Sequence, residues 1–237
     1  MTVSKDRKPA GVASIEETIG AFARGEFVIV FDSHGENEGD LMIAAEDMTS
    51  GKMAFMVKHT SGFICAPIPQ SRADELGLPL MVKENADPNS AAFSVTVDGV
   101  HPSISTGISA EDRARTCRLL ADPASTPMTF GRPGHILPLR AVDEGIRRRQ
   151  GHTEAVVELC RLAGKHLAGV LGEMVLDGDA DPDGKTEYVG GRMMIRNDCL
   201  AFGKRWGIKV CTMEDLVAYV EGEYGQLAAV GSNCPAG

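Results

Sequence analysis

Residues 27–45 read FVIVFDSHGENEGDLMIAA and decide the fold of this chain. Two apolar runs of strand length, 27–31 and 41–45, flank a short polar loop, which predicts a hairpin-like pair of strands. The first run is continuous and apolar, so we expect it to be buried on both faces. The loop between them carries Glu36, Glu38 and Asp40 at alternate positions, which places three carboxylates on one side of an extended backbone.

These carboxylates cannot all lie in a core, because each needs water, a cation or a hydrogen-bond donor. A solvated acidic turn is the ordinary fate of such a cluster. Here the flanking strands fix the backbone, which favours a binding site. If His152 folds back onto the loop, carboxylate and imidazole together make a small site for a divalent cation.

Outward from this hairpin, helices and strands alternate without strict strand–helix–strand repeats. The pattern predicts an α/β (α+β) fold with three layers, in which helices cover both faces of a mixed, twisted sheet. We expect one catalytic domain over 14–224, with flexible tails at 1–13 and 225–237 and an exposed excursion at 176–191. Helices are expected at 14–25, 49–59, 109–120, 152–163, 197–206 and from 212, and further strands at 63–66, 93–97, 136–139, 168–175 and 208–211.

Composition excludes several classes of function. The chain has 237 residues, a formal net charge of −9 and only 5% aromatic residues, which argues against general binding to nucleic acid or to an anionic membrane surface. No apolar run approaches the about 20 residues of a membrane span. Six cysteines occur without a CxxC pair, so we expect reduced thiols and a cytoplasmic protein.

A second candidate site begins at a predicted helix. Arg149, Gln150 and Gly151 precede His152 and Thr153, so an arginine, a hydroxyl and free helix amides come together as a phosphate site. The alternative is that Thr153 or His152 only caps the helix and that the arginines form a solvated face. Thr106 opens a similar loop before a second predicted helix, which could also hold phosphate, although a simple cap is the more ordinary role of Ser109 there.

Two further residues are candidates for proton transfer. Glu173 interrupts the apolar stretch 168–176, and an acid in a buried strand needs a partner or a raised pKa. His135 lies in the predicted turn 132–135, and histidine titrates near physiological pH, although a lone histidine is more often structural. Cys65 is expected to act as a small apolar group in the wall of a pocket.

Taken together, six blocks resemble the 3,4-dihydroxy-2-butanone 4-phosphate synthase family of riboflavin biosynthesis. They occur in the family's order between about residues 14 and 222, which makes the resemblance far more specific than any single block. No extension similar to GTP cyclohydrolase II follows, so the monofunctional form is expected. The blocks are Glu36–Leu41, His59–Cys65, Thr106–Ala110, Arg132–His135, Gly151–Ala155 and Thr212–Leu216.

The resemblance implies that D-ribulose 5-phosphate is converted to 3,4-dihydroxy-2-butanone 4-phosphate and formate. It implies Mg²⁺ or Mn²⁺, with two ions per site, and a homodimer whose active sites lie near the interface. By position, Glu36 and His152 would bind the metal, and His135 and Glu173 would transfer protons. The residues expected to contact the sugar phosphate are Glu38, Asp40, Cys65, Thr106, Arg149, Gln150, Gly151 and Thr153.

One departure from the family pattern leaves alternatives open. The family usually has an arginine immediately before the first acid of the loop, where this chain has Gly35. Either His34 or Arg149 compensates, or activity is weakened, or the enzyme acts on another sugar phosphate or diketone. A catalytically dead binding homologue is a third possibility, against which the retained acids and histidines argue.

Overall fold

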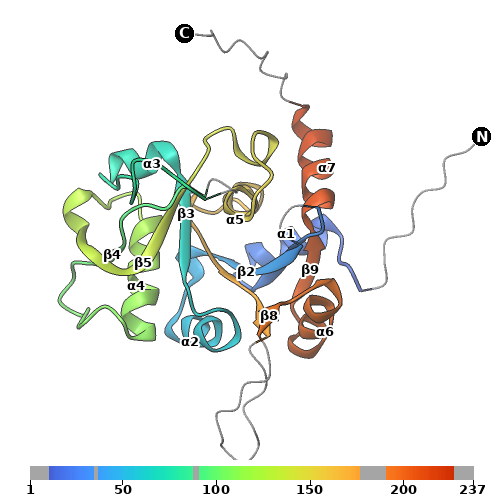
Figure 1. The fold of residues 1–237 in the computed structure, drawn as a ribbon, viewed down its shortest axis with the longest axis horizontal. Coiled ribbons are helices and arrows are strands. Elements are labelled where there is room, and N and C mark those ends of the chain that lie inside the picture. Colours follow the sequence, from blue (N-terminus) through green and yellow to red (C-terminus); the bar gives the residue numbers. More distant parts are fainter. Residues whose placement is uncertain (1–10, 35–36, 88–90, 177–190, 227–237) are drawn as a thin grey trace, which may run out of the picture.

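A seven-stranded mixed sheet forms the middle layer of the computed structural model, which describes residues 11–34, 37–87, 91–176 and 191–226 (Figure 1). The strand order is β4-β5-β3-β6-β2-β1-β9, and a separate two-stranded ribbon pairs β7 with β8. The strands are β1 (Val28–Asp32), β2 (Glu38–Ala44), β3 (Cys65–Pro69), β4 (Val97–Gly99), β5 (Phe130–Ala141), β6 (Gly169–Glu173), β7 (Val175–Leu176), β8 (Arg192–Met193) and β9 (Lys209–Thr212).

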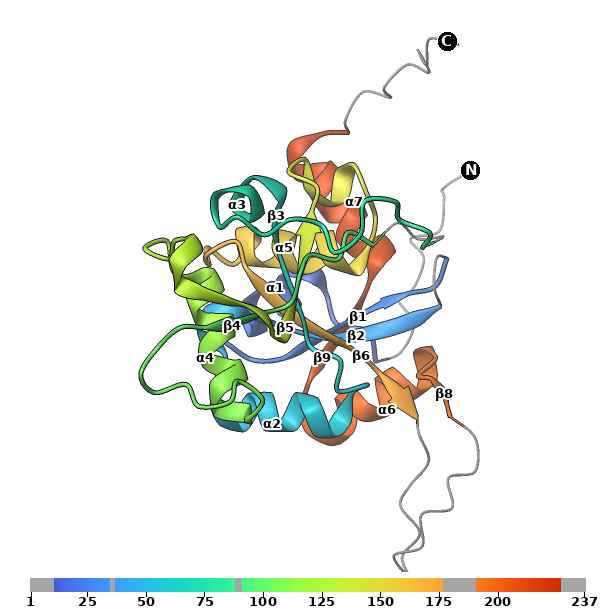
Figure 2. The ribbon, with the colours of Figure 1, turned by 60° about the vertical axis from the view of Figure 1, so that its left-hand side comes forward.

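Helices cover both faces of the sheet, which confirms the predicted three layers (Figure 2). On one face lie α2 (Ser50–His59), α4 (Ala110–Ala121) and α6 (Arg196–Trp206); on the other lie α1 (Ile15–Ala23), α5 (His152–Leu162) and α7 (Met213–Tyr224). The remaining helix, α3 (Gln70–Glu75), and three short 3₁₀ turns, Ala45–Asp47, Pro127–Thr129 and Gly145–Arg147, connect these elements. None of the helices in the described residues is long and apolar enough to cross a membrane.

The helix starts expected from the sequence are confirmed. Ser14 accepts the backbone N–H of Glu17, whose carboxylate accepts the N–H of Ser14 in return, which forms a capping box at the start of α1. Thr49, Ser109 and Thr212 cap α2, α4 and α7 through their hydroxyl groups. Each cap therefore fixes the residue at which a helix begins.

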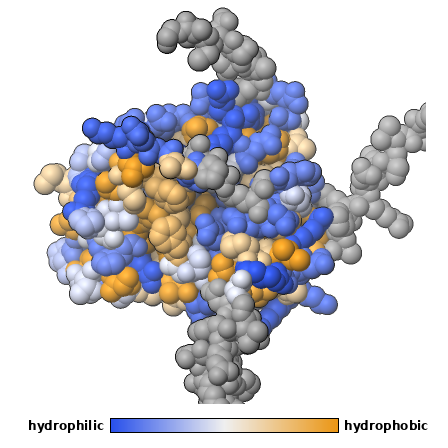
Figure 3. Space-filling model, in the orientation of Figure 1, coloured by the Kyte–Doolittle hydropathy of each residue, from blue (hydrophilic) through white to orange (hydrophobic). Residues whose placement is uncertain are grey.

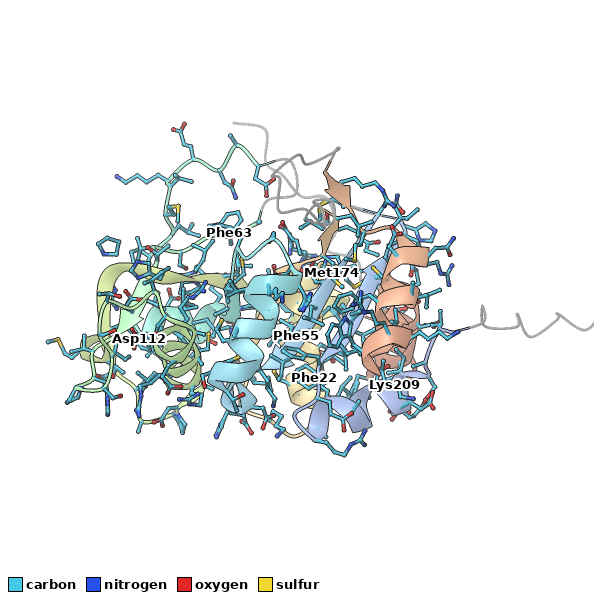
Figure 4. All side chains as sticks on the ribbon, turned by 90° about the horizontal axis from the view of Figure 1, so that it is seen from below. Phe22, Phe55, Phe63, Asp112, Met174 and Lys209 are labelled. Atoms are coloured by element: carbon cyan, nitrogen blue, oxygen red, sulfur yellow. The ribbon has the colours of Figure 1, made fainter. Side chains whose placement is uncertain are left out.

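Apolar side chains on both helical layers hold the sheet in place. Between α2 and α6 the rings of Phe55 and Trp206 meet edge to face with centroids 5.0 Å apart, and Figure 4 shows Phe55 pointing from α2 toward α6. The cysteines in the described part of the chain are buried free thiols. Residues 1–10, 177–190 and 227–237 lie outside the described residues, so the predicted tails and excursion stay predictions.

The hairpin predicted at 27–45 is confirmed: β1 and β2 pair antiparallel, with Val30 opposite Asp40 and Asp32 opposite Glu38. Glu38 and Asp40 lie in a strand instead of the expected loop, because β2 begins at Glu38 instead of Leu41. Both acids pair with residues of β1, and Asp40 also pairs with β6, so Glu38 and Asp40 become part of the sheet. Their alternate spacing then puts both carboxylates on the same face.

Two predicted strands are too short. The sequence places a break at Pro67, but β3 continues through Pro67 to Pro69. Because β6 pairs with β3 only at Cys65, one side of β3 needs no N–H donor beyond that residue, and proline is tolerated there.

The other short prediction concerns β5, which starts at Phe130, so the segment 132–135 is part of a strand and not a turn. Its first half pairs with β4 across a register shift between Val97 and Asp98, the kind of irregularity at which glycine and proline are common. The strand expected at 93–97 is correspondingly reduced: β4 begins at Val97, and Phe93 forms only an isolated bridge with Leu139.

Candidate functional site

A cavity of about 220 Å³ opens where the adjacent strands β2 and β6 meet the start of α5. Polar residues line one part of it and apolar side chains the rest. The lining consists of Asp32, Glu38, Asp40, Cys65, Ala91, Phe93, Leu139, Arg149, Gln150, Gly151, His152, Thr153, Leu171 and Glu173. Segments more than a hundred positions apart in the sequence therefore share one small pocket.

Three of these residues form a cluster of possible metal ligands. One donor atom each of Glu38, Asp40 and His152 lies within 4.8 Å of the other two. Nδ1 of His152 is 4.0 Å from Oδ2 of Asp40, and both side chains are buried. Two carboxylates and an imidazole suit a divalent cation such as Mg²⁺ or Mn²⁺, so the residues present fit the expected metal.

Glu173 lies opposite Asp40 in the β2–β6 ladder, at the end of β6. The expectation that it is buried was wrong, because its side chain is exposed. The apolar stretch is buried only up to Gly172, and Glu173 is the residue at which β6 reaches the cavity. An acid that faces the cavity can accept a proton from a bound molecule without the cost of a buried charge.

Cys65 forms part of the cavity wall, as the sequence predicts. Burial raises the pKa of the Cys65 thiol, and the nearby carboxylates of Asp40 and Glu173 raise it further. The thiol therefore stays protonated, and Cys65 behaves as a small apolar group in place of a nucleophile.

The start of α5 provides the opposite chemistry. Gly151 is the N-cap and makes no side-chain capping bond, so the helix turns its first amides toward the cavity without a side-chain cap. The Arg149 guanidinium lies over Gly151, where a Cβ would come within 2.5 Å of Nη1. The absence of a side chain at Gly151 leaves room for this approach, and the helix amides with Arg149 and Thr153 are suited to an anion.

A buried carboxylate holds Arg149 in this position. Oε2 of Glu154 is 2.6 Å from Nη1 of Arg149, and Oε1 accepts the backbone N–H of Val142. The Glu154 side chain is 1% exposed. Burial raises the pKa of Glu154, and the charge and hydrogen bond of Arg149 offset only part of this rise, so the ion pair partly compensates the burial of the carboxylate.

Not every predicted residue reaches the cavity. His135 lies on β5 and contacts Asp98 on β4, and Thr106 lies in the loop before α4; neither lines the cavity. Glu36 and Gly35 fall outside the described residues, so the predicted metal contact of Glu36 and the effect of Gly35 are untested. Of the two residues considered as substitutes for the arginine, Arg149 lines the cavity, whereas His34 contacts Glu214.

Asp32 is a site residue that sequence reasoning missed. It ends β1, lines the cavity and accepts the backbone N–H of His34 at 2.9 Å. The available signal was an acid that directly ends a continuous apolar strand before the acidic loop. The apolar members of the wall, such as Leu139 and Leu171, gave no such signal because they are also core positions.

Comparison with known proteins agrees with this geometry. Residues 16–219 match the family model for 3,4-dihydroxy-2-butanone 4-phosphate synthase. A protein of that name from Pyricularia oryzae is 53% identical over 220 residues, which cover 92% of this chain and 94% of the relative. A second, from Saccharomyces cerevisiae, is 46% identical and covers 87% of this chain and 98% of its own.

A solved structure is also similar along most of its length. It is a crystal structure of 3,4-dihydroxy-2-butanone 4-phosphate synthase in complex with two magnesium ions, and it has a TM-score of 0.88 and 53% identity. The match covers 91% of this chain and 100% of the other. By family model, relatives and fold alike, this chain belongs to the 3,4-dihydroxy-2-butanone 4-phosphate synthase family.

Proposed function

We propose that this protein is a lyase of riboflavin biosynthesis that converts D-ribulose 5-phosphate to 3,4-dihydroxy-2-butanone 4-phosphate and formate. The observation that carries the proposal is the shared cavity, in which the ligand cluster Glu38, Asp40 and His152 lies beside the anion site at the start of α5. A sugar phosphate has the matching two ends: hydroxyl and carbonyl oxygens for a cation, and a phosphate for Arg149 and the helix amides.

The cavity supplies the groups that the first step needs. Enolisation of a ketose removes a carbon-bound proton. We assign Glu173 as the base, since it is exposed at the end of β6 and lies opposite Asp40 in the β2–β6 pair. When bound by the acid–imidazole cluster, a divalent cation would act as a Lewis acid that stabilises the enediolate. Phe93, Leu139 and Leu171 shield the reacting carbons from water on the remaining sides.

We further propose Mg²⁺, or Mn²⁺ in its place, with two ions per site. The two magnesium ions in the similar crystal structure support this number, as do the hard oxygen donors of Glu38 and Asp40. Glu36 is the additional ligand that we expect. A cytoplasmic location fits the free thiols of the described cysteines.

A homodimer accounts for the two predicted residues that lie away from the cavity. Figure 3 shows apolar side chains gathered on one face of the molecule. Phe63 is 54% exposed, and its ring centroid lies 6.4 Å from that of Phe93 in the cavity wall. Leu80, Met81 and Val82 are also exposed, and the N–H of Met81 donates to the carbonyl of Phe93. A second copy packed on this face would cover apolar surface, and we propose that its own His135 and Thr106 then complete the cavity. Light scattering should give twice the mass of 25.2 kDa, and the monomer mass would contradict the dimer.

The test of the activity is direct. Purified protein with D-ribulose 5-phosphate and Mg²⁺ should release formate, and the release should stop on chelation of the metal. Folded protein that forms no formate above background would defeat the proposal. Faster turnover of another sugar phosphate or of a diketone would instead favour a changed substrate.

The Glu154–Arg149 pair gives a prediction about phosphate binding. Glu154→Gln should raise KM for ribulose 5-phosphate about tenfold, because a charge-assisted hydrogen bond worth about 1.5–3 kcal/mol no longer holds the guanidinium over Gly151. Turnover at saturation should change little. Initial rates over a range of substrate concentrations separate the two quantities.

The same helix offers a matched control. Glu158 is also buried and pairs with Arg161 one turn further along α5, but it lies outside the cavity. Glu158→Gln should leave KM unchanged. Equal changes in KM for both variants would mean that the helix as a whole, and not Arg149, responds to the loss of a buried acid.

A further inference from the structure

Asp98 on β4 contacts His135 on β5 at two points. Its Oδ1 accepts the backbone N–H of His135 at 2.9 Å, and its Oδ2 lies 2.7 Å from the ring nitrogen Nδ1. The side chains of Asp98 and His135 are 19% and 39% exposed, so the contact lies at the edge of solvent. One carboxylate therefore fixes both the backbone and the ring of the same residue.

The strands are shaped around this contact. At Gly134 a Cβ would lie 2.0 Å from the carbonyl carbon of Val97 and 2.2 Å from the amide nitrogen of Asp98. Only glycine therefore allows the backbones of β5 and β4 to come this close. The N–H of Gly134 donates to the hydroxyl of Thr96. The register shift of the β4–β5 pair falls at the same place, between Val97 and Asp98. Such an irregularity changes the direction of a side chain, and here the side chain of Asp98 contacts His135.

On its other side the carboxylate meets a second glycine. Gly107 has φ +87°, and a Cβ there would lie 2.1 Å from Oδ2 of Asp98. Asp112 on α4 (Figure 4) fixes this loop by accepting the N–H groups of Ser105 and Gly107. The carboxylate of Asp98 is thus confined between His135 and the loop that carries Thr106.

The contact sets the chemistry of the ring. An ionised carboxylate only accepts hydrogen bonds, so the nitrogen facing it must carry the proton. A neutral imidazole with its proton on Nδ1 has a free lone pair on Nε2. We propose that Asp98 is the positioning residue of His135, which it holds in the Nδ1–H tautomer with Nε2 ready to accept a proton.

This inference rests on the proposed function, in which His135 meets the substrate. After Glu173 has removed the carbon-bound proton, Nε2 takes the proton of a hydroxyl group of the resulting enediol, whose oxygen becomes a carbonyl oxygen, and the ring becomes an imidazolium that lies against the carboxylate of Asp98. Nε2–H then gives the same proton to the departing hydroxyl group in the dehydration, which leaves as water, and the ring returns to the neutral tautomer. No proton is gained or lost over the two steps.

Asp98→Asn tests the role. The amide of asparagine presents an N–H to Nδ1, which favours the tautomer with its proton on Nε2, and kcat should fall about 10²–10⁴-fold. KM should stay within about threefold, because Asp98 does not touch the phosphate site. Asp98→Glu, which keeps the carboxylate, should recover part of the rate. The ¹⁵N resonances of His135 in the wild-type protein should show the proton on Nδ1.

A matched control is an aspartate that pairs with another residue of the same strand. Asp74 on α3 pairs with Arg140 of β5 and is remote from His135, so Asp74→Asn should keep the full rate. The inference fails if active wild-type protein carries the His135 proton on Nε2, or if Asp98→Asn or His135→Gln keeps more than a third of the rate. If the wild type forms no formate, the proposed function fails instead. Should Asp98→Asn not fold, the wild-type resonances and the Asp98→Glu rate decide.

Discussion

Glu173→Gln is expected to lower kcat for ribulose 5-phosphate by about 10²–10⁴-fold while the protein stays folded. Glutamine has the shape of glutamate but cannot take a proton from carbon. The side chain is exposed at the end of β6, so the substitution places no new polar group in the core. Formate release at saturating substrate measures kcat, and thermal unfolding measures the fold.

Calorimetry separates this role from metal binding. Because Glu173 lies outside the ligand cluster of Glu38, Asp40 and His152, the Gln variant should bind Mn²⁺ as the wild type does. Glu223→Gln, at the exposed end of α7, serves as the control and should keep the full rate. If the Glu173 variant keeps a tenth of the rate or more, another group must be the base.

The second large effect is expected for His152→Ala. This substitution removes the imidazole from the ligand cluster, so divalent-cation affinity should fall by more than the about 10–100-fold that loss of a supporting residue costs. Lewis-acid stabilisation is worth several kcal/mol, so kcat should fall by about 10³-fold or more. The fold should survive, because alanine is a good first residue for α5.

Titration with Mn²⁺ and Mg²⁺ by calorimetry checks the affinity, and formate release checks the rate. His166→Ala is the control, since His166 is exposed and lies outside the cavity. A His152 variant that binds the cation normally yet is inactive would show that the imidazole acts on the substrate and not on the metal.

Local physics made much of the fold predictable. Residues 27–45 predict a hairpin, because the backbone groups of two buried apolar runs need hydrogen-bond partners. Helix starts are predicted by hydroxyl side chains that cap free amides, namely those of Ser14, Thr49, Ser109 and Thr212. The extent of β3 and β5 was not predictable, since proline and glycine mark breaks in an isolated strand. Here the neighbouring strands decide which side of the chain needs donors.

For the site, the sequence predicted which residues take part better than it predicted their burial and their contacts. The alternate spacing of Glu38 and Asp40 correctly put both on one face. The burial of Glu173 was misjudged because the apolar stretch around it does not reveal where β6 ends. Asp32 was missed because its partner His34 is close in sequence and its role depends on β2. His135 lies outside the cavity of the single chain, and its predicted role stays a prediction that rests on the proposed dimer.

Four acids, Asp32, Glu38, Asp40 and Glu173, line one small cavity of this structure. Like charges at such short range repel, so the folded protein should be more stable when a cation is bound. A ligand that binds only the folded state adds about 2.7 kcal/mol when its concentration is a hundred times its Kd. Magnesium scarcity would therefore reduce the amount of intact enzyme in a cell as well as its rate, and chelators in a purification buffer would shorten its shelf life.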